Sequence, residues 1–261
     1  MDHNGGDAMD KKFETLKTPP ILETTLSVSL QRAHFSKDEL VRIMDGVAAN
    51  ALSKEDIIES NFVCANLPNG TPNVSQSQRW AGFRVTVEKN LVITILNLKD
   101  ENAVQVACSI LPPYSAWAVF IGKAMPLIKK FCENALAERI LRVGVRSINR
   151  IVVDGLFPLT DYLRAMPPDP LSKGGAFIDG FSYVESFYYP NTKLRAVLIR
   201  RAEDVAGHKK SFIIDIDVCA LSKEYELSNP FDGSLLDELH ELRDGLFFGS
   251  IGKSALEEAR R

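Results

Sequence analysis

Cysteine and histidine are both scarce in this chain of 261 residues, which contains four of each. The cysteines are far apart and form no Cys-x-x-Cys pair, which disfavours a zinc ribbon or a disulfide framework and favours reduced thiols in the cytoplasm. The histidines show no His-x-x-x-His spacing, which disfavours a metal site built on imidazole. We expect the last of them, His240, on the exposed side of a helix.

Recognisable catalytic and membrane signatures are also missing. The sequence has no Gly-x-Ser-x-Gly elbow and neither of the glycine-rich phosphate loops, so it indicates no enzyme class and no cofactor. No apolar run is long enough to cross a bilayer, and the N-terminus lacks the pattern of a signal peptide. The formal charge of −3 gives no general attraction to nucleic acid or anionic membranes. Nucleic acid is therefore disfavoured as a partner, although a local arginine-rich face keeps it open.

Residues 139–154 form the stretch around which the chain is organised, and they alternate as a strand does. Arg142, Arg146 and Arg150 share one face, while Asn149 belongs to the other, more apolar face. Guanidinium groups stay charged and fit carboxylates and phosphates. The row therefore predicts either an anion-binding site or a set of structural ion pairs with a neighbouring strand, and we favour the ion pairs.

Two acidic residues could supply those partners. Asp215 and Asp217 share one face of a predicted strand over residues 211–221. If that strand lies close to residues 139–154, the carboxylates can pair with Arg146 or Arg150. The alternative is a Mg²⁺ site completed by a third carboxylate such as Asp179.

The first half of the chain reads as strands that surround one helix. Ser36 and Glu39 form a capping box at the start of that helix. Residues 54–60 predict a short second helix, and the sequence up to residue 78 predicts a long surface loop. We expect strands over residues 21–30, 83–88, 91–98 and 103–111.

A longer helix is predicted over residues 115–134, with Pro126 expected to bend or interrupt it. Tyr114 and Trp117 lie at its start, where they could stack on a ligand or cover an edge of the core. The second half then repeats the order of the first. Its predicted elements are strands over residues 139–154, 177–189, 194–201 and 211–221, a helix over 234–248 and a further helical turn or two over 250–261.

These elements predict an α+β fold. Each half gives four strands followed by a helix, so we expect two sequential four-strand-plus-helix units that form a broad antiparallel sheet with helices packed on one face. The expected divisions are a disordered tail over residues 1–17, a first unit over 18–136 and a second unit over 137–261, packed intimately on the first. The uncovered sheet face is where we expect a partner to bind.

Several short signatures also occur in a fixed order along the chain. They are Pro19-Pro20-x-x-Glu23, Pro113-Tyr114-x-x-Trp117, Val145-Arg146-x-x-Asn149-Arg150-Ile151, Asp215-x-Asp217, and Leu239-His240 followed by Phe247-x-x-x-Ile251. In this order they resemble a sporadically distributed prokaryotic protein family of unknown function and roughly this length. The chain departs from the family at Ser147, where an aromatic residue is usual, and at Gly252, where a threonine is expected. The resemblance implies a cytosolic protein from a mobile or defence-related gene context and supplies no chemistry.

Three functional hypotheses follow from the sequence. The leading one is a non-catalytic binding or assembly protein that works through its sheet face or by self-association, with a protein as partner. The second is a pocket for a small anionic or apolar ligand between sheet and helices, lined by Arg146, Arg150 and aromatic residues. The third is a metal-dependent enzyme that uses Asp215 and Asp217.

Overall fold

The computed structural model describes most of the chain; of the tail predicted over residues 1–17, residues 1–15 lie outside the described part. The described residues are 16–31, 35–66, 72–98, 102–114, 116–154, 159–164, 180–204, 209–222 and 233–260.

Within those ranges the fold is α+β, with one broad antiparallel sheet. Its strands are β1 (Ile21–Gln31), β2 (Ser53–Asn66), β3 (Pro72–Glu88), β4 (Leu91–Leu98), β5 (Ala103–Ile110), β6 (Arg139–Asp154), β7 (Ser182–Tyr189), β8 (Leu194–Asp204) and β9 (Lys209–Leu221). The helices are α1 (Lys37–Val47), α2 (Trp117–Ala135), α3 (Leu159–Tyr162), α4 (Gly233–Ser250) and α5 (Lys253–Arg260). None of the described helices is long and apolar enough to cross a membrane.

Strands β1 and β6 meet at the middle of the sheet. β1 pairs with β6 in antiparallel register, with Leu26 opposite Val145 and Val28 opposite Val143. From β1 the sheet continues outward through β5, β4, β3 and β2. From β6 it continues through β9, β8 and β7. The arginine-bearing stretch is therefore a central strand, as the sequence predicts.

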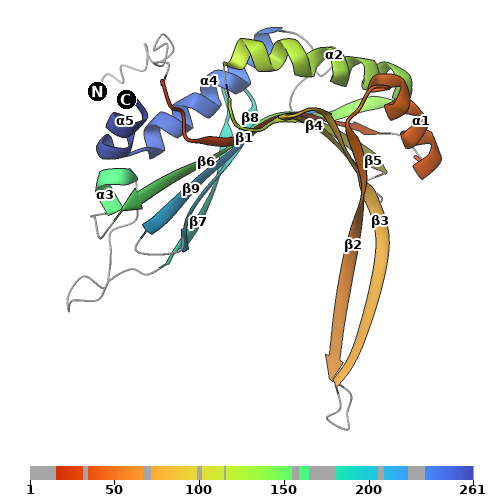
Figure 1. The fold of residues 1–261 in the computed structure, drawn as a ribbon, viewed down its shortest axis with the longest axis horizontal. Helices are drawn as coiled ribbons and strands as arrows, with labels where there is room; N and C mark the ends of the chain where they lie inside the picture. The colour runs from red at the N-terminus through yellow and green to blue at the C-terminus, as the bar shows by residue number, and fades with distance from the viewer. Residues whose placement is uncertain are drawn as a thin grey trace.

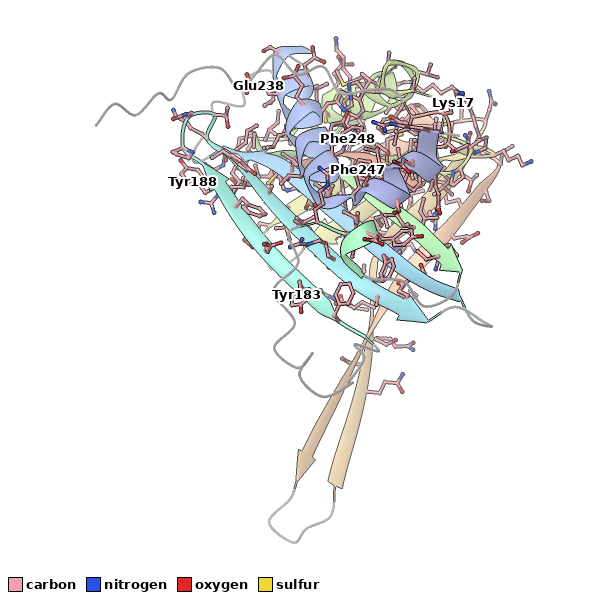
Figure 2. The ribbon with its side chains drawn as sticks, turned by 90° about the vertical axis from the view of Figure 1, so that its left-hand side faces the viewer. Lys17, Tyr183, Tyr188, Glu238, Phe247 and Phe248 are labelled. Atoms are coloured by element: carbon pink, nitrogen blue, oxygen red, sulfur yellow. The ribbon has the colours of Figure 1, made fainter. Side chains whose placement is uncertain are left out.

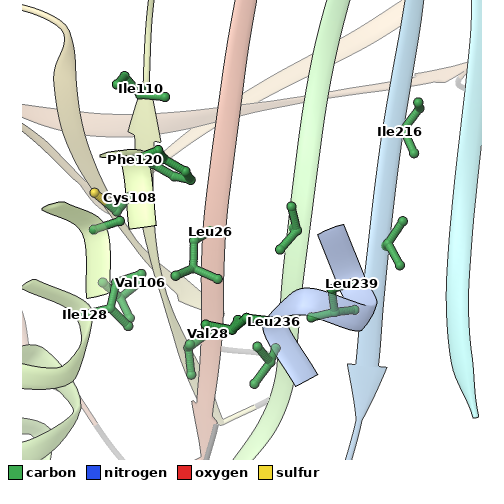
Figure 3. Close-up of a cluster of buried hydrophobic side chains, with 14 of the residues drawn as sticks. Leu26, Val28, Val106, Cys108, Ile110, Phe120, Ile128, Ile216, Leu236 and Leu239 are labelled. Atoms are coloured by element: carbon green, nitrogen blue, oxygen red, sulfur yellow. The ribbon is translucent and has the colours of Figure 1, made fainter. Parts of the chain in front are cut away.

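The two faces of this sheet differ. Helices α1, α2 and α4 lie on one face, which we call the covered face (Figure 1). Its residues form a continuous core to which both halves of the chain contribute, and Figure 3 shows part of it, where Leu26, Phe120 and Leu239 all point into the core. Each fully buried side chain of this size contributes about 1.5–3 kcal/mol relative to an exposed one. The opposite face, which we call the open face, lies on the inner side of the bent sheet in Figure 1.

The sequence wrongly predicts the region between α1 and β4. Residues 54–60 are not helical but belong to β2, and the predicted loop up to residue 78 lies largely in β2 and β3. β3 pairs with β4 only from Gly82 onward, so the rest of β3 pairs with β2 alone and the two form a projecting arm (Figure 1). A two-stranded ribbon has no buried face and so shows no apolar alternation, which hides it from pattern analysis.

Other local predictions are confirmed or corrected at the level of single residues. The Ser36 Oγ accepts a hydrogen bond of 3.2 Å from the amide of Glu39 and caps α1, as predicted. Pro126 does not interrupt α2, because a row of buried residues that includes Phe120, Ile128 and Phe131 anchors the helix on both sides of it. β7 begins at Ser182, and residues 177–179 of the predicted strand lie outside the described residues.

Candidate functional site: charged side chains on the open sheet face

The predicted arginine and aspartate residues lie together on the open face. Arg142, Arg146 and Arg150 project from β6, and Asp215 and Asp217 project from the adjacent strand β9. We call these five residues the charged row. Strand alternation places them there, because the intervening residues of both strands point into the core beneath the helices.

Arg146 and Asp215 form the best-defined pair of the row. Arg146 Nε donates to Asp215 Oδ1 at 2.8 Å, and Arg146 Nη2 donates to Asp215 Oδ2 at 2.6 Å. This two-point contact matches the planar guanidinium to the planar carboxylate. The hydrogen bond that Arg146 donates to Asp215 raises the pKa of Arg146, against a smaller opposing effect of burial. The ion pair predicted from the sequence is therefore present.

Arg142 reaches its partners across a glycine. Its Nη1 donates to Ser27 Oγ on β1 at 2.8 Å, and its Nη2 donates to Asp217 Oδ1 at 2.5 Å. The guanidinium lies over Gly144, where an added Cβ would come within 2.3 Å of Arg142 Nη1. Glycine in the middle of a strand is unfavourable by itself, but here it leaves the space that the arginine needs.

Arg150, at the far end of the row, pairs with a residue that the sequence did not single out. Its Nη2 donates to Glu203 Oε2 on β8 at 3.0 Å, and the same glutamate also binds Arg201. Arg150 borders a cavity of about 180 Å³ between β6, α5 and the entry to β1. Sites for small molecules usually enclose about 300–1,000 Å³, so this cavity is small for a ligand.

All charges in the row are thus engaged within the protein. Because Arg146 and Arg150 are each about half exposed, water screens their pairs, and such pairs contribute on the order of 0–1 kcal/mol each. The carboxylates of Asp215 and Asp217 already accept arginine hydrogen bonds, which would compete with a metal ion. In the part of the chain that the structure describes, no group of three or more His, Cys, Asp or Glu residues could hold a metal. Asp179, the third carboxylate considered, lies outside that part.

Asn149, predicted with this group, is held elsewhere. It lies on the covered face, where its Nδ2 donates to the Ile214 carbonyl at 3.1 Å and more weakly to Ser147 Oγ at 3.4 Å. Its side chain is buried, because odd-numbered residues of β6 point toward the helices. The structure therefore does not bring Asn149 to the charged row.

Tyr114 and Trp117 form a second cluster, remote from the row, between the start of α2 and α4. The Trp117 ring stacks on His240 with centroids 4.4 Å apart, and the Arg243 guanidinium lies 5.1 Å from the Trp117 ring. The prediction that His240 is on the exposed side of its helix is wrong, because Trp117 covers it. Burial, reinforced by the charge of Arg243, lowers the pKa of His240 to about 4. Burial likewise raises the pKa of Tyr114.

The pocket hypothesis also needs correction. It places Arg146 and Arg150 between sheet and helices, but strand alternation puts both on the face opposite to α1, α2 and α4, and Arg150 borders the small cavity beside α5. The space beneath the helices is filled in the described chain by the core side chains. The physical reason is again the alternation of β6, which cannot direct valine and arginine from successive positions to the same face.

Sequence reasoning missed several residues that shape the open face. Gly144 and Ser27 carried a usable signal, because both fall on the same face as the arginines in the alternation. Glu203 carried no such signal in the sequence, because its strand was predicted to end at residue 201, whereas β8 extends to Asp204. A further pair, Arg200 with Glu185, joins β8 to β7 on the covered side, and Arg200 Nη1 also donates to the Arg164 carbonyl at 2.8 Å.

Comparisons with known proteins add little to this geometry. No family model and no curated protein matches the chain. Among solved structures, it is similar to DynU16, described as a putative protein in the dynemicin biosynthetic locus. The sequences are 10% identical over 93% of this chain and 100% of that chain, with a TM-score of 0.25. At that TM-score the likeness does not bear on function.

Proposed function

We propose that the protein is a non-catalytic binding protein that holds a partner protein against the open face of its sheet. The observation that carries this proposal is the charged row, whose three arginines pair with Asp217, Asp215 and Glu203 and so form an ordered polar surface with balanced charges. Paired charges of this kind suit a protein surface with complementary groups, because they give specificity without a net field. A site for nucleic acid would instead present an excess of unpaired basic groups.

The floor of the open face beside the row supports the same interpretation. Across β5 and β1 many of its side chains are small, and Ala107, Ser109, Ser27 and Ser29 are all buried although none of the described helices covers them. Thr25 and Ser109 hydrogen-bond to each other at 2.8 Å, so the hydroxyl groups are satisfied locally. Small, satisfied side chains let the main chain or the larger side chains of a partner approach the sheet closely.

The arm formed by β2 and β3 would extend this surface. It projects beyond the sheet on the side opposite to β7 (Figure 1). Arg79 and Glu59 form an ion pair of 2.5 Å across the ribbon. A stiffened arm beside a concave face would increase the area available to a partner, and a specific protein interface buries about 800 Å² on each side.

The division of the chain into two like units belongs to this proposal. The strands pair in the same order outward from β1 and from β6, while α2 contacts β1 and β5 and α4 contacts β6 and β9. This order supports an internal repeat over residues 18–136 and 137–261, related by a pseudo-twofold axis between β1 and β6. We place the protein in the cytoplasm, which the free thiols of Cys108, Cys132 and Cys219 support.

The test compares the two faces by removing the same charge from each. The open-face variant carries Arg146→Ala and Arg150→Ala, and the control carries Lys129→Ala and Lys130→Ala, which are exposed on α2. Tagged full-length chains are expressed in the source organism, and recovered proteins are quantified by mass spectrometry. We expect a partner that the wild type and the α2 variant retain and the open-face variant loses by at least tenfold. Equal recovery by both variants would contradict the proposal.

A further inference from the structure

Strand β7 forms one border of the sheet, and no strand in the described part of the chain pairs with its outer side. Figure 2 shows it along that border, with Tyr188 toward one end and Tyr183 toward the other. Soluble proteins usually protect such edges with lysine, proline or a bulge, because unpaired main-chain groups recruit other strands. β7 contains no lysine, arginine or proline, and its register with β8 has no shift.

The opposite border of the sheet is built differently. β2 carries Lys54, Glu55, Asp56 and Glu59 within its first seven residues. Charged side chains of this density discourage strand addition. The two border strands thus differ in their content of charged side chains, which decides whether another strand can pair with them. Of the two, β7 is the strand to which another strand can be added.

The main-chain groups that face outward on β7 can be identified. The amide of Ala202 donates to the carbonyl of Phe181 at 3.1 Å, so these opposed residues form a hydrogen-bonded pair. Hydrogen-bonded and non-hydrogen-bonded pairs alternate along an antiparallel ladder. The odd-numbered residues of β7 therefore direct their N–H and C=O groups toward β8. The even-numbered residues, which are Ser182, Val184, Ser186 and Tyr188, direct theirs outward.

The same even-numbered residues place apolar side chains on the open face. Val184 is 63% exposed and Tyr188 is 48% exposed. Arg195 lies over the Tyr188 ring at 5.1 Å and holds it along the strand. Exposed main-chain groups and exposed apolar side chains thus coincide on the same residues, which is what strand addition requires.

We propose that two copies of this chain associate through β7 as an antiparallel pair, which joins their sheets about a two-fold axis at Ser186. The inference goes beyond the proposed function and stands without it. The two registers of greatest overlap centre the axis on Glu185 or on Ser186. The first sets Glu185 directly opposite its own copy, where like charges repel. The second sets Val184 opposite Tyr188 and Tyr183 opposite Tyr189, which are favourable cross-strand pairs.

The first test is sedimentation velocity of the purified full chain over a range of concentrations. The variant is Val184→Lys, and the control is Val152→Lys, because Val152 is 44% exposed on the same face but lies on central strand β6. We expect a dimer for the wild type and for Val152→Lys, and a dissociation constant at least tenfold higher for Val184→Lys. A wild type that stays monomeric at all concentrations, or a dimer that Val184→Lys leaves unchanged, would overturn the proposal.

The second test fixes the register and does not depend on whether Val184→Lys folds. In the proposed dimer the two Ser186 Cα atoms are about 5.5 Å apart, as in any hydrogen-bonded pair, which a disulfide can span. Ser186→Cys should therefore give a covalent dimer after mild oxidation, well above the background of the native cysteines. Ser182→Cys serves as the control. It should not give a covalent dimer, because Pro190 of the other copy lies opposite residue 182. A covalent dimer from Ser182→Cys, or none from Ser186→Cys, would overturn the Ser186 axis.

Discussion

The two faces of β6 meet different environments, although they alternate residue by residue along the same strand. Val143 and Val145 are fully buried in the core, while Arg146 and Arg150 are each about half exposed to water. The covered face gains its free energy from apolar burial, which is large and not directional. The open face holds partly exposed ion pairs, which add little stability but define a geometry. Alternation along one strand thus separates the residues that stabilise the fold from those available for recognition.

This contrast predicts that the largest loss of stability follows a change on the covered face. Phe120 of α2 is fully buried against the sheet, so Phe120→Ala removes apolar contacts and leaves a cavity. We expect the free energy of unfolding to fall by about 3–5 kcal/mol, measured by urea denaturation. A loss below about 1 kcal/mol would show that α2 does not anchor the core.

A pH dependence of stability should arise from His240, which lies between the helices of the covered face. His240 has a pKa of about 4 in the fold, against an ordinary value of 6.5, because burial and Arg243 disfavour its charged form. The unfolded chain therefore binds the proton more readily, and the contribution of His240 to stability is complete above pH 6.5 and is lost as the pH falls toward 4. We expect this contribution to be about 3 kcal/mol, because a change of one in pKa corresponds to about 1.4 kcal/mol. Urea midpoints over this pH range should show a slope that His240→Gln flattens, and an unchanged slope would contradict the assignment.

Substitutions in the charged row should lower the free energy of unfolding by less than Phe120→Ala does. Arg146→Ala leaves the Asp215 carboxylate without its two-point partner. Asp215 is buried beside Arg146, but the half-exposed arginine leaves a space through which water can reach the carboxylate from the open face. We expect a loss of about 1 kcal/mol. A double-mutant cycle with Asp215→Ala measures the coupling between the two side chains. A coupling above about 3 kcal/mol would mean that the pair behaves as a buried one and helps to hold the fold.

The smallest loss of stability is expected for a substitution that only requires a flexible side chain to move. In Gly144→Ala the new Cβ meets the end of the Arg142 side chain, which can swing away at a cost of about 0.5 kcal/mol. The same change at Gly82 sets the Cβ 1.9 Å from the Ile95 carbonyl oxygen, at a positive φ of 158°, and should cost more than about 2 kcal/mol. Thermal unfolding of both variants checks that Gly82→Ala loses more stability than Gly144→Ala. The reverse result would contradict the placing of the Arg142 side chain over Gly144.

The sequence predicts those parts of the molecule in which one face of a strand is buried. β6 was predicted to the residue, because arginines at every fourth position share one face while Val143, Val145 and Val153 fall on the other. The β2–β3 arm was missed, since the apolar residues of β2 stand next to one another and do not alternate, and its ladder depends on a partner strand that local sequence does not reveal. The same argument applies to helix α2, whose continuity past Pro126 depends on packing against β1 and β5.

The candidate site was predictable only in part, for a related reason. Alternation identifies the face that a side chain occupies, and so it placed Arg146 and Asp215 together. It does not identify which side chains touch, because partners depend on strand order and on side-chain reach. Asp217 lies directly opposite Arg146 in the ladder, yet it binds Arg142, which extends over Gly144 to reach it.

The most direct test of the account attaches a photo-activated cross-linker to each side of the sheet in turn. Val152 on the open face and Val119 on α2 are suitable positions, because they are 44% and 48% exposed and chemically identical. The full chain, with the cross-linking amino acid at one position or the other, is irradiated in cells of the source organism. We expect a discrete adduct with another protein from position 152 and none from position 119. An adduct from position 119 alone, or equal adducts from both, would contradict the assignment of recognition to the open face.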